Sequence, residues 1–198
     1  MYSIPTTVDI EGKQFKIRNN GDYRMVLDCF SALNDPELNT EERLFGSLII
    51  FYDDLNSLSD IQLLPNIAVA VKKMLEFFNC GQPESVARTA QHKLIDWDSD
   101  SQLICSAINK VAGTEIRAEK YCHWWTFMGY YSAIGNCPLS NIIHIRHKML
   151  TGKELDKEEK EFRRDNPQYF VWNTNNYDDK EADDLFKQLW GTGGDING

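Results

Sequence analysis

The spacing of hydrophobic residues changes near Asp22 from a period of two to the period of an α-helix. Before this point, apolar residues alternate with polar ones on both sides of the turn sequence Glu11-Gly12; they are Val8, Ile10, Phe15 and Ile17. Alternation around such a turn is typical of a β-hairpin. Beyond Asp22, apolar residues recur every three or four positions, as in amphipathic helices. The pattern therefore predicts one hairpin followed by a helical chain.

Six segments have the helical spacing, and each ends near a glycine, a proline or a polar cluster. We expect Thr40 to cap the second helix, and Asp98 or Asp100 to cap the fourth. A capping box formed by Asp156 and Glu159 predicts a short polar helix after the sixth. The six segments cover about residues 22–35, 40–55, 64–78, 103–111, 118–134 and 139–150.

Length and composition favour a single globular domain. The chain has 198 residues, of which 42% are hydrophobic and 12% aromatic, enough to build a core. We expect a mostly α fold with a helical-bundle domain over residues 21–166. An N-terminal β-hairpin or arm precedes it over residues 1–20. An acidic, largely flexible tail with a short amphipathic segment follows over residues 167–198.

Charge and hydropathy argue against nucleic-acid and membrane partners. The formal net charge of −9 disfavours contact with phosphate backbones. No apolar stretch reaches the ~18 residues that a membrane-spanning helix needs, and the N-terminus lacks the pattern of a secretory signal. The cysteines are odd in number and widely spaced, which favours free thiols in a reducing cytoplasm; they are Cys29, Cys80, Cys105, Cys122 and Cys137.

Two patterns suggest metal sites, but each has a simpler interpretation. The acidic residues of "DWDSDS" (96–101) alternate as in a calcium loop, yet Ser101 and Ala107 stand where an EF-hand needs glycine and glutamate. His144 and His147, with Cys122-His123 on another segment, lack the paired spacing of zinc ligands. We therefore expect no metal ion.

The sequence also lacks the common catalytic motifs. It has no GxSxG, no phosphate-binding glycine loop and no GxGxxG. We expect neither catalytic residues nor a cofactor, so the protein is not predicted to be an enzyme. An enzyme that uses His123 and Cys122 is the least favoured alternative.

Arg146 flanks the apolar stripe of the sixth helical segment, where it follows Ile142 and Ile143. An arginine in this place is ordinarily paired with a carboxylate, and the acidic cluster Asp96–Asp100 could supply one. The alternative is an arginine at the helix edge whose charged end reaches solvent. Periodicity alone leaves both alternatives open.

The segment "KYCHWWTFMGYY" (120–131) is unusually aromatic. Its large side chains follow two helical stripes, which predicts a helix buried on both sides, in a core or at an interface between proteins. Nucleic-acid stacking would require interleaved basic residues, and only Lys120 is near. Adjacent helix positions point ~100° apart, so we expect one of Trp124 and Trp125 in the core and the other near the surface. Candidate partner-binding residues in this segment are Trp124, Trp125, Tyr130 and Tyr131.

The tail contains a second candidate partner-binding segment, "DDLFKQLW" (183–190). Its apolar residues form one face of a two-turn helix; they are Leu185, Phe186, Leu189 and Trp190. A helix this short is marginal alone in water, which favours a motif that folds on docking into a groove. The alternative is a last helix of the domain core.

Three stretches resemble the bacteriophage gp15 family of long-tailed phages and prophages of Gram-positive bacteria. They are "IDWDSDSQLICSAINKVAGTEI", "HWWTFMGYYSAIG" and "PLSNIIHIRHKMLTGKELDKEEKEFRRDN". The family pattern has a D-[WF]-x-x-D entry to a helix, an HWW-x-F helix and an I-I-x-[IY]-R helix. Its motif residues fall here on Asp96, Trp97, Asp100, His123, Phe127 and Arg146. The resemblance covers about residues 94–166 and is weaker over the N-terminal half.

The resemblance implies a role in tail assembly. The family's genes typically lie between those of the tail-tube protein and the tape-measure protein, the place of tail assembly chaperones. It therefore implies protein–protein interaction with the tape-measure and tail-tube proteins in the host cell cytoplasm, and absence from the mature virion. A homo-oligomer is left open. The alternative is a structural virion component, such as a tail-completion or connector protein.

Overall fold

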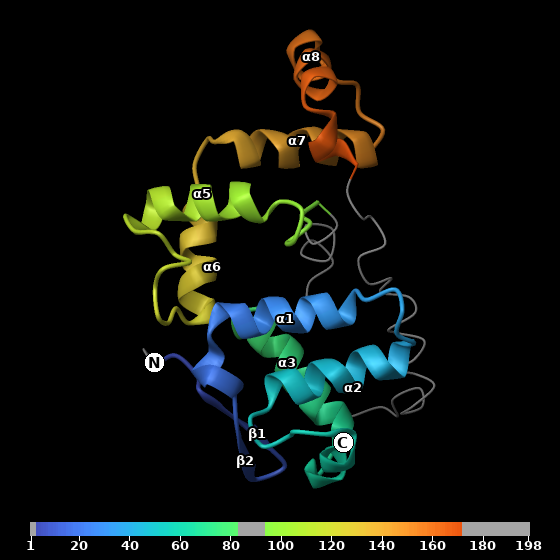
Figure 1. Ribbon diagram of the computed structural model, residues 1–198, viewed down its shortest axis with the longest axis vertical. Helices are drawn as coiled ribbons and strands as arrows, with labels where there is room; N and C mark the ends of the chain where they lie inside the picture. The colour runs from blue at the N-terminus through green and yellow to red at the C-terminus, as the bar shows by residue number, and fades with distance from the viewer. Residues whose placement is uncertain (1–2, 83–93, 172–198) are drawn as a thin grey trace, which may run out of the picture. The chain divides into compact units, whose positions relative to one another are not determined.

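The computed structural model describes residues 3–82 and 94–171. Apart from two short strands, the elements in this part of the chain are helical (Figure 1), which confirms a mostly α fold with an N-terminal hairpin. The described residues group into two compact units. Unit 1 contains residues 3–82 and 123–125, and unit 2 contains residues 94–122 and 126–171. The expected domain limits at residues 20 and 166 stay a prediction.

The N-terminal hairpin consists of β1 (Thr7–Ile10) and β2 (Lys13–Lys16), which pair antiparallel with Val8 opposite Phe15. Both turn residues are left-handed, with φ of 52° at Glu11 and 83° at Gly12. Two left-handed residues match the twist of the strands, and glycine adopts this conformation without strain. The turn forms where the sequence placed it.

Unit 1 continues through η1 (Arg18–Gly21) into α1 (Tyr23–Leu33) and α2 (Thr40–Phe51). The expected cap of α2 was wrong by one residue. Asn39, not Thr40, occupies the N-cap, and its side chain accepts a hydrogen bond from the backbone N–H of Glu42. The Glu42 carboxylate in turn accepts from the backbone N–H of Asn39, which completes a capping box.

The third predicted helix begins later than the apolar pattern suggested. A 3₁₀ turn, η2 (Leu58–Leu63), comes first, and α3 runs only over Ile67–Phe78. Pro65 lies between them and disfavours a helical conformation at the residue before it. Asn66 then caps α3 by accepting a hydrogen bond from the backbone N–H of Val69, 3.2 Å away.

The core of unit 1 joins the hairpin to the three helices. In Figure 1, α1 and α2 lie alongside each other and α3 crosses behind them. Phe51 packs edge-on against Tyr52, Phe77 and Phe78. The Tyr52 hydroxyl donates a hydrogen bond to the carbonyl of Ala70 in α3, so this buried polar group is satisfied. The largest fully buried side chains of this core include Phe15, Ile17, Leu48, Leu55 and Met74.

Unit 2 contains α5 (Ser101–Ala112), α7 (Pro138–Leu150), α8 (Lys157–Asp165) and η3 (Pro167–Phe170). The capping box of Asp156 and Glu159 at the start of α8 is confirmed. Four buried side chains form the core cluster around α7: Ile142, Ile145, Leu155 and Phe170. Among the described residues, no helix is long and apolar enough to cross a bilayer.

The aromatic helix is shorter than predicted. α6 covers Trp124–Ser132 rather than residues 118–134. Its first two residues belong to unit 1, and the rest belong to unit 2. Small residues at Thr126, Gly129 and Ser132 form an exposed line along the helix, and burial of both apolar stripes, in a core or at an interface, stays a prediction.

Candidate functional site

His123, Trp124 and Trp125 form a buried cluster in unit 1, which we call the His–Trp–Trp cluster. His123 is 2% exposed and immediately precedes α6. Its Nδ1 accepts a hydrogen bond from the backbone N–H of Trp125, at 3.0 Å, as a capping side chain does. Its Nε2 lies 3.0 Å from the carbonyl oxygen of Pro5. This cap explains why α6 begins at residue 124 and not at Ala118.

These two contacts fix the proton on His123. The backbone N–H can only donate, so Nδ1 must be the unprotonated nitrogen, and Nε2 carries the hydrogen that it donates to Pro5. Burial lowers the pKa of His123, while its bond to Pro5 and the nearby Asp22 act in the opposite direction. The imidazole is therefore held neutral, in the role of a structural cap.

The two tryptophans of the cluster bind the C-terminal end of α3. The indole N–H of Trp124 donates to the carbonyl of Phe78, and that of Trp125 donates to the carbonyl of Phe77, both at 2.9 Å. The last carbonyls of a helix lack the partners that continue the helix. The Phe77 carbonyl also accepts from the backbone N–H of Cys80, and the Trp124 indole supplies a donor to the Phe78 carbonyl. Trp124 is 1% exposed and Trp125 is partly exposed, which confirms the expected difference in burial.

Gly21 lies against this cluster at van der Waals limits. A Cβ atom at this position would come within 2.7 Å of the Phe77 ring and 2.9 Å of Nε2 of His123. Its φ of 78° is also in the left-handed region. The close approach of backbone to ring requires a residue without a side chain.

Arg146 and Asp100 form a buried ion pair in unit 2, and each is 1% exposed. The contact is bidentate: Nη1 lies 2.5 Å from Oδ2, and Nη2 lies 3.0 Å from Oδ1. The remaining donors of the guanidinium reach the carbonyl of Leu94 at 2.9 Å and that of Tyr169 at 2.6 and 2.9 Å. We call these four residues the Arg146 cluster. It confirms the alternative in which Arg146 pairs with the acidic segment.

The acidic segment 96–100 is folded around this ion pair. Asp100 occupies the N-cap position of α5, as one of the two expected residues, but its side chain makes no capping bond. Its Oδ2 instead accepts from Arg146 and from the backbone N–H of Asp96. The Asp96 carboxylate accepts from the backbone N–H groups of Asp98 and Ser99. These carboxylates therefore accept from backbone N–H groups of the turn and from the guanidinium of Arg146.

The other predicted residues of α6 lie in unit 2. The ring of Trp97 packs against those of Phe127 and Tyr131, with centroids 6.4 and 5.8 Å apart. Phe127 is buried, and Tyr131 is partly buried, which raises the pKa of its hydroxyl to about 12. Tyr130 is also partly exposed. Trp125, Tyr130 and Tyr131 thus retain some accessible surface, whereas Trp124 serves the core.

Glu159, which sequence analysis did not assign to a site, attaches α8 to α7. Its carboxylate lies 2.6 and 2.7 Å from the ammonium of Lys148 and 3.2 Å from Nε2 of His144. The Lys148 hydrogen bonds, and then the backbone N–H of Asp156, lower the pKa of Glu159. One signal was present: Glu159 is the third residue of a capping box, so its carboxylate had to lie at the start of the helix.

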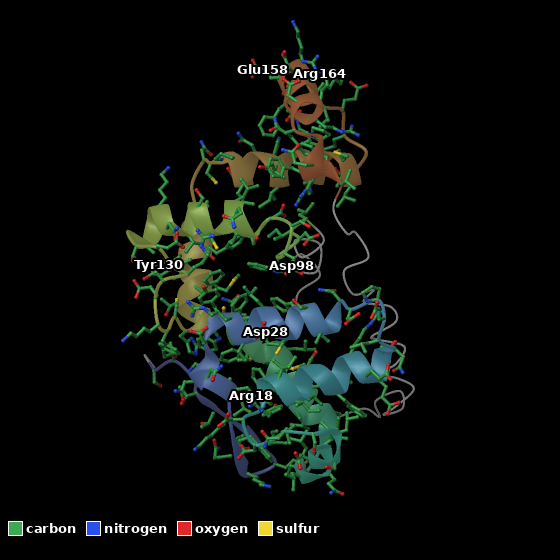
Figure 2. The ribbon with its side chains drawn as sticks, viewed as in Figure 1. Arg18, Asp28, Asp98, Tyr130, Glu158 and Arg164 are labelled. Atoms are coloured by element: carbon green, nitrogen blue, oxygen red, sulfur yellow. The ribbon has the colours of Figure 1, made fainter. Side chains whose placement is uncertain are left out.

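Arg18 is a second residue that sequence analysis missed. From η1 (Figure 2), its guanidinium donates to four backbone carbonyls at the end of α2: Ile49, Ile50, Tyr52 and Leu55. A cation at this end also complements the helix dipole. Backbone carbonyls occur at every residue, so no sequence pattern identifies such acceptors.

Two of the described thiols, those of Cys29 and Cys105, have raised pKa values. Burial raises the pKa of the Cys29 thiol, as does the charge of Asp28, and the pKa of Cys105 is also raised by burial. Among the described residues, no group of three or more His, Cys, Asp and Glu side chains could hold a metal ion. The tail residues Leu185, Phe186, Leu189 and Trp190 lie outside the described residues.

Comparison with known proteins gives one match. Residues 2–170 match the model of a family described as Bacteriophage Gp15 protein. The match includes the N-terminal hairpin and so extends well beyond the region 94–166 that carried the resemblance. No curated protein and no solved structure matches the chain.

Proposed function

We propose, from the premise that the chain belongs to the bacteriophage Gp15 protein family, that it is a tail assembly chaperone. In this role it binds the tape-measure protein, recruits tail-tube subunits to it, and is left out of the mature virion. It acts in the host cytoplasm, where tails assemble.

The observation that supports this proposal is the use of the motif residues within the fold. The polar atoms of His123 and Arg146 form hydrogen bonds with backbone groups or a carboxylate of the same chain. Asp100 accepts only from within unit 2 in the contacts described above. The family's most distinctive side chains thus build a scaffold, which fits a protein that works through its surface rather than through a reaction.

The described surface has exposed apolar and aromatic side chains that could contact another protein. Unit 1 presents two exposed leucines on η2, Leu58 at 64% and Leu63 at 47% exposure. Partly exposed aromatic rings, which are common in protein interfaces, occur at Trp125 and Tyr130. An acidic protein also suits transient binding, because its net charge opposes self-association.

The test is co-expression of the full chain with the tape-measure protein encoded beside it. The proposal expects a complex that survives size-exclusion chromatography, together with absence of the chain from purified particles in quantitative mass spectrometry. A variant with Leu185→Ala and Trp190→Ala should weaken the complex. Trp172→Ala is a matched control, since it removes a tryptophan of the same tail outside the apolar segment.

Each outcome discriminates. Stoichiometric presence in finished particles would refute the chaperone role and favour a tail-completion or connector protein. Failure to form any complex with either the tape-measure or the tail-tube protein would refute the proposed function as a whole.

A further inference from the structure

α8 is attached to unit 2 by few contacts. None of its residues is buried, and its nine residues include a single large apolar side chain, Phe162. Phe162 packs edge-on against Phe170, with ring centroids 6.3 Å apart, above the core cluster that contains Ile142 and Ile145. Within residues 94–171, α8 is also attached through the Glu159 carboxylate, which contacts Lys148 and His144. Glu158 and Arg164, labelled in Figure 2, belong to the exposed surface of the helix.

The surface beneath α8 has a defined chemistry. It presents Lys148 and His144 of α7 beside the ring of Phe170 in η3, and we call these three residues the α8 seat. A matching helix needs an acidic residue and, three positions later, an aromatic residue, because such residues share one helical face. α8 meets this requirement with Glu159 and Phe162.

The tail contains a second segment with the same arrangement. Asp183 precedes Phe186 by three positions, as Glu159 precedes Phe162, and each phenylalanine is followed by a basic residue. Trp190 lies one turn beyond Phe186 on the same helical face. This segment has four large apolar residues where α8 has one, so it can bury more apolar surface on the same seat.

The chain length permits this contact. Roughly a dozen residues separate Phe170, the last residue of η3, from Asp183. Such a spacer can extend to about 40 Å, and a short tether gives an effective concentration on the order of millimolar. Binding of the tail to the α8 seat of its own chain is therefore favoured over binding to the seat of a second copy.

We propose that residues 181–190 of the tail bind the α8 seat of their own chain in competition with α8, with Asp183 in the place of Glu159 and Phe186 in the place of Phe162. The exchange places the tail's apolar face on unit 2 and releases the charged helix α8. It rests on the geometry of α7, α8 and η3 and on the sequence of the tail, and its test does not require the tape-measure protein.

The experiment uses the full chain with the photo-crosslinking residue p-benzoylphenylalanine in place of Trp190. Irradiation of the purified protein, followed by peptide mass spectrometry, should join residue 190 to α7 or η3. Mixing isotopically light and heavy chains before irradiation distinguishes the source, since a tail bound to its own seat gives only unmixed pairs. Mixed pairs as the main product would overturn the intramolecular assignment, and crosslinks to unit 1 would overturn the seat.

Charge variants test the register. Asp183→Lys places a cation against Lys148 and should lower the crosslink yield about fivefold or more, while Asp184→Lys, about 100° around the helix, should change it less than about twofold. Lys148→Glu combined with Asp183→Lys restores an opposite pair for the tail and repels Glu159, so the yield should recover. Equal losses in the two single variants would refute the proposed register.

Competition has its own signature. Glu159→Gln keeps the capping box of α8, because glutamine can accept the same backbone bond, but removes the charge that faces Lys148. The crosslink yield should then rise by roughly twofold or more. Circular dichroism of each variant checks that the helical content is retained. A yield that falls or stays constant in Glu159→Gln would show that α8 and the tail do not compete.

Discussion

Breaking the Asp100–Arg146 pair should destabilise unit 2 by several kcal/mol, and the size of the loss follows from its burial. Both side chains are 1% exposed, so Arg146→Met leaves a carboxylate inside the protein without a counter-charge. Loss of one partner from a buried pair costs about 3–5 kcal/mol. Asp100→Asn leaves the guanidinium uncompensated and should cost a similar amount.

The double variant separates charge from hydrogen bonding. Asp100→Asn with Arg146→Met has no buried charge, and asparagine can still accept from the backbone N–H of Asp96. Only the carbonyls of Leu94 and Tyr169 lose their donors, at about 1–3 kcal/mol each where they stay dry. The double variant should therefore be less destabilised than the sum of the two single variants, by about 2 kcal/mol or more.

Amide hydrogen exchange is the appropriate assay, because it gives local opening free energies when a chain with two compact units departs from two-state unfolding. Peptides from α5 and α7 should lose protection, and peptides from α1 and α2 should not. Lys148→Met is a control on the same helix that removes a more exposed cation, with a much smaller expected effect. Additive single effects, or unchanged protection in α7, would refute the assigned role of the pair.

Three further predictions concern unit 1, each measured by urea denaturation of the full chain. Burial lowers the pKa of His123 in the folded chain, so as the pH falls the unfolded chain takes up a proton at this histidine first. The contribution of His123 to the free energy of unfolding is therefore complete above about pH 6.5 and declines below it. His123→Asn, which caps without titrating, should lack that decline. Gly21→Ala should cost about 1–3 kcal/mol more than Gly12→Ala, because both have positive φ but only Gly21 would clash with neighbouring rings. Trp124→Ala should cost about 3–5 kcal/mol, and Trp124→Phe about 1–2 kcal/mol for the lost indole hydrogen bond; a Trp124→Phe variant as stable as the original chain would contradict the bond to α3.

Local signals predicted the hairpin and most helices, because their causes lie within a few residues. Glu11-Gly12 supplies both left-handed turn residues, and Asp156 with Glu159 closes a capping box inside one turn. The start of α6 was misplaced for a reason that no local pattern contains. Residues 118–122 fit a helical period, but the helix begins after His123, whose ring caps it and also contacts the distant Pro5.

For the candidate site, the sequence predicted which residues are buried or paired, but in most cases not which atoms they contact. The sequence left two alternatives for Arg146: an ion pair with a carboxylate of Asp96–Asp100, or a guanidinium that reaches solvent at the helix edge. Which carboxylate it takes depends on the folded turn, where Asp96 holds backbone N–H groups and Asp100 remains for the arginine. For Trp124 and Trp125, helical geometry predicted the difference in burial, but their acceptors are carbonyls of α3 that no pattern distinguishes.

Three side chains of the family motif, Arg146, Trp124 and Trp125, donate hydrogen bonds to backbone carbonyls. Arg146 binds the carbonyls of Leu94 and Tyr169, and the two indoles bind those of α3. Contacts to backbone carbonyls constrain the donor side chain strongly but leave the identity of the accepting residue free. A motif of this kind specifies a fold and tolerates wide variation elsewhere. Exposed positions outside these bonds, such as Leu58, can be substituted without disturbing them, so they are the places to test for effects on binding alone.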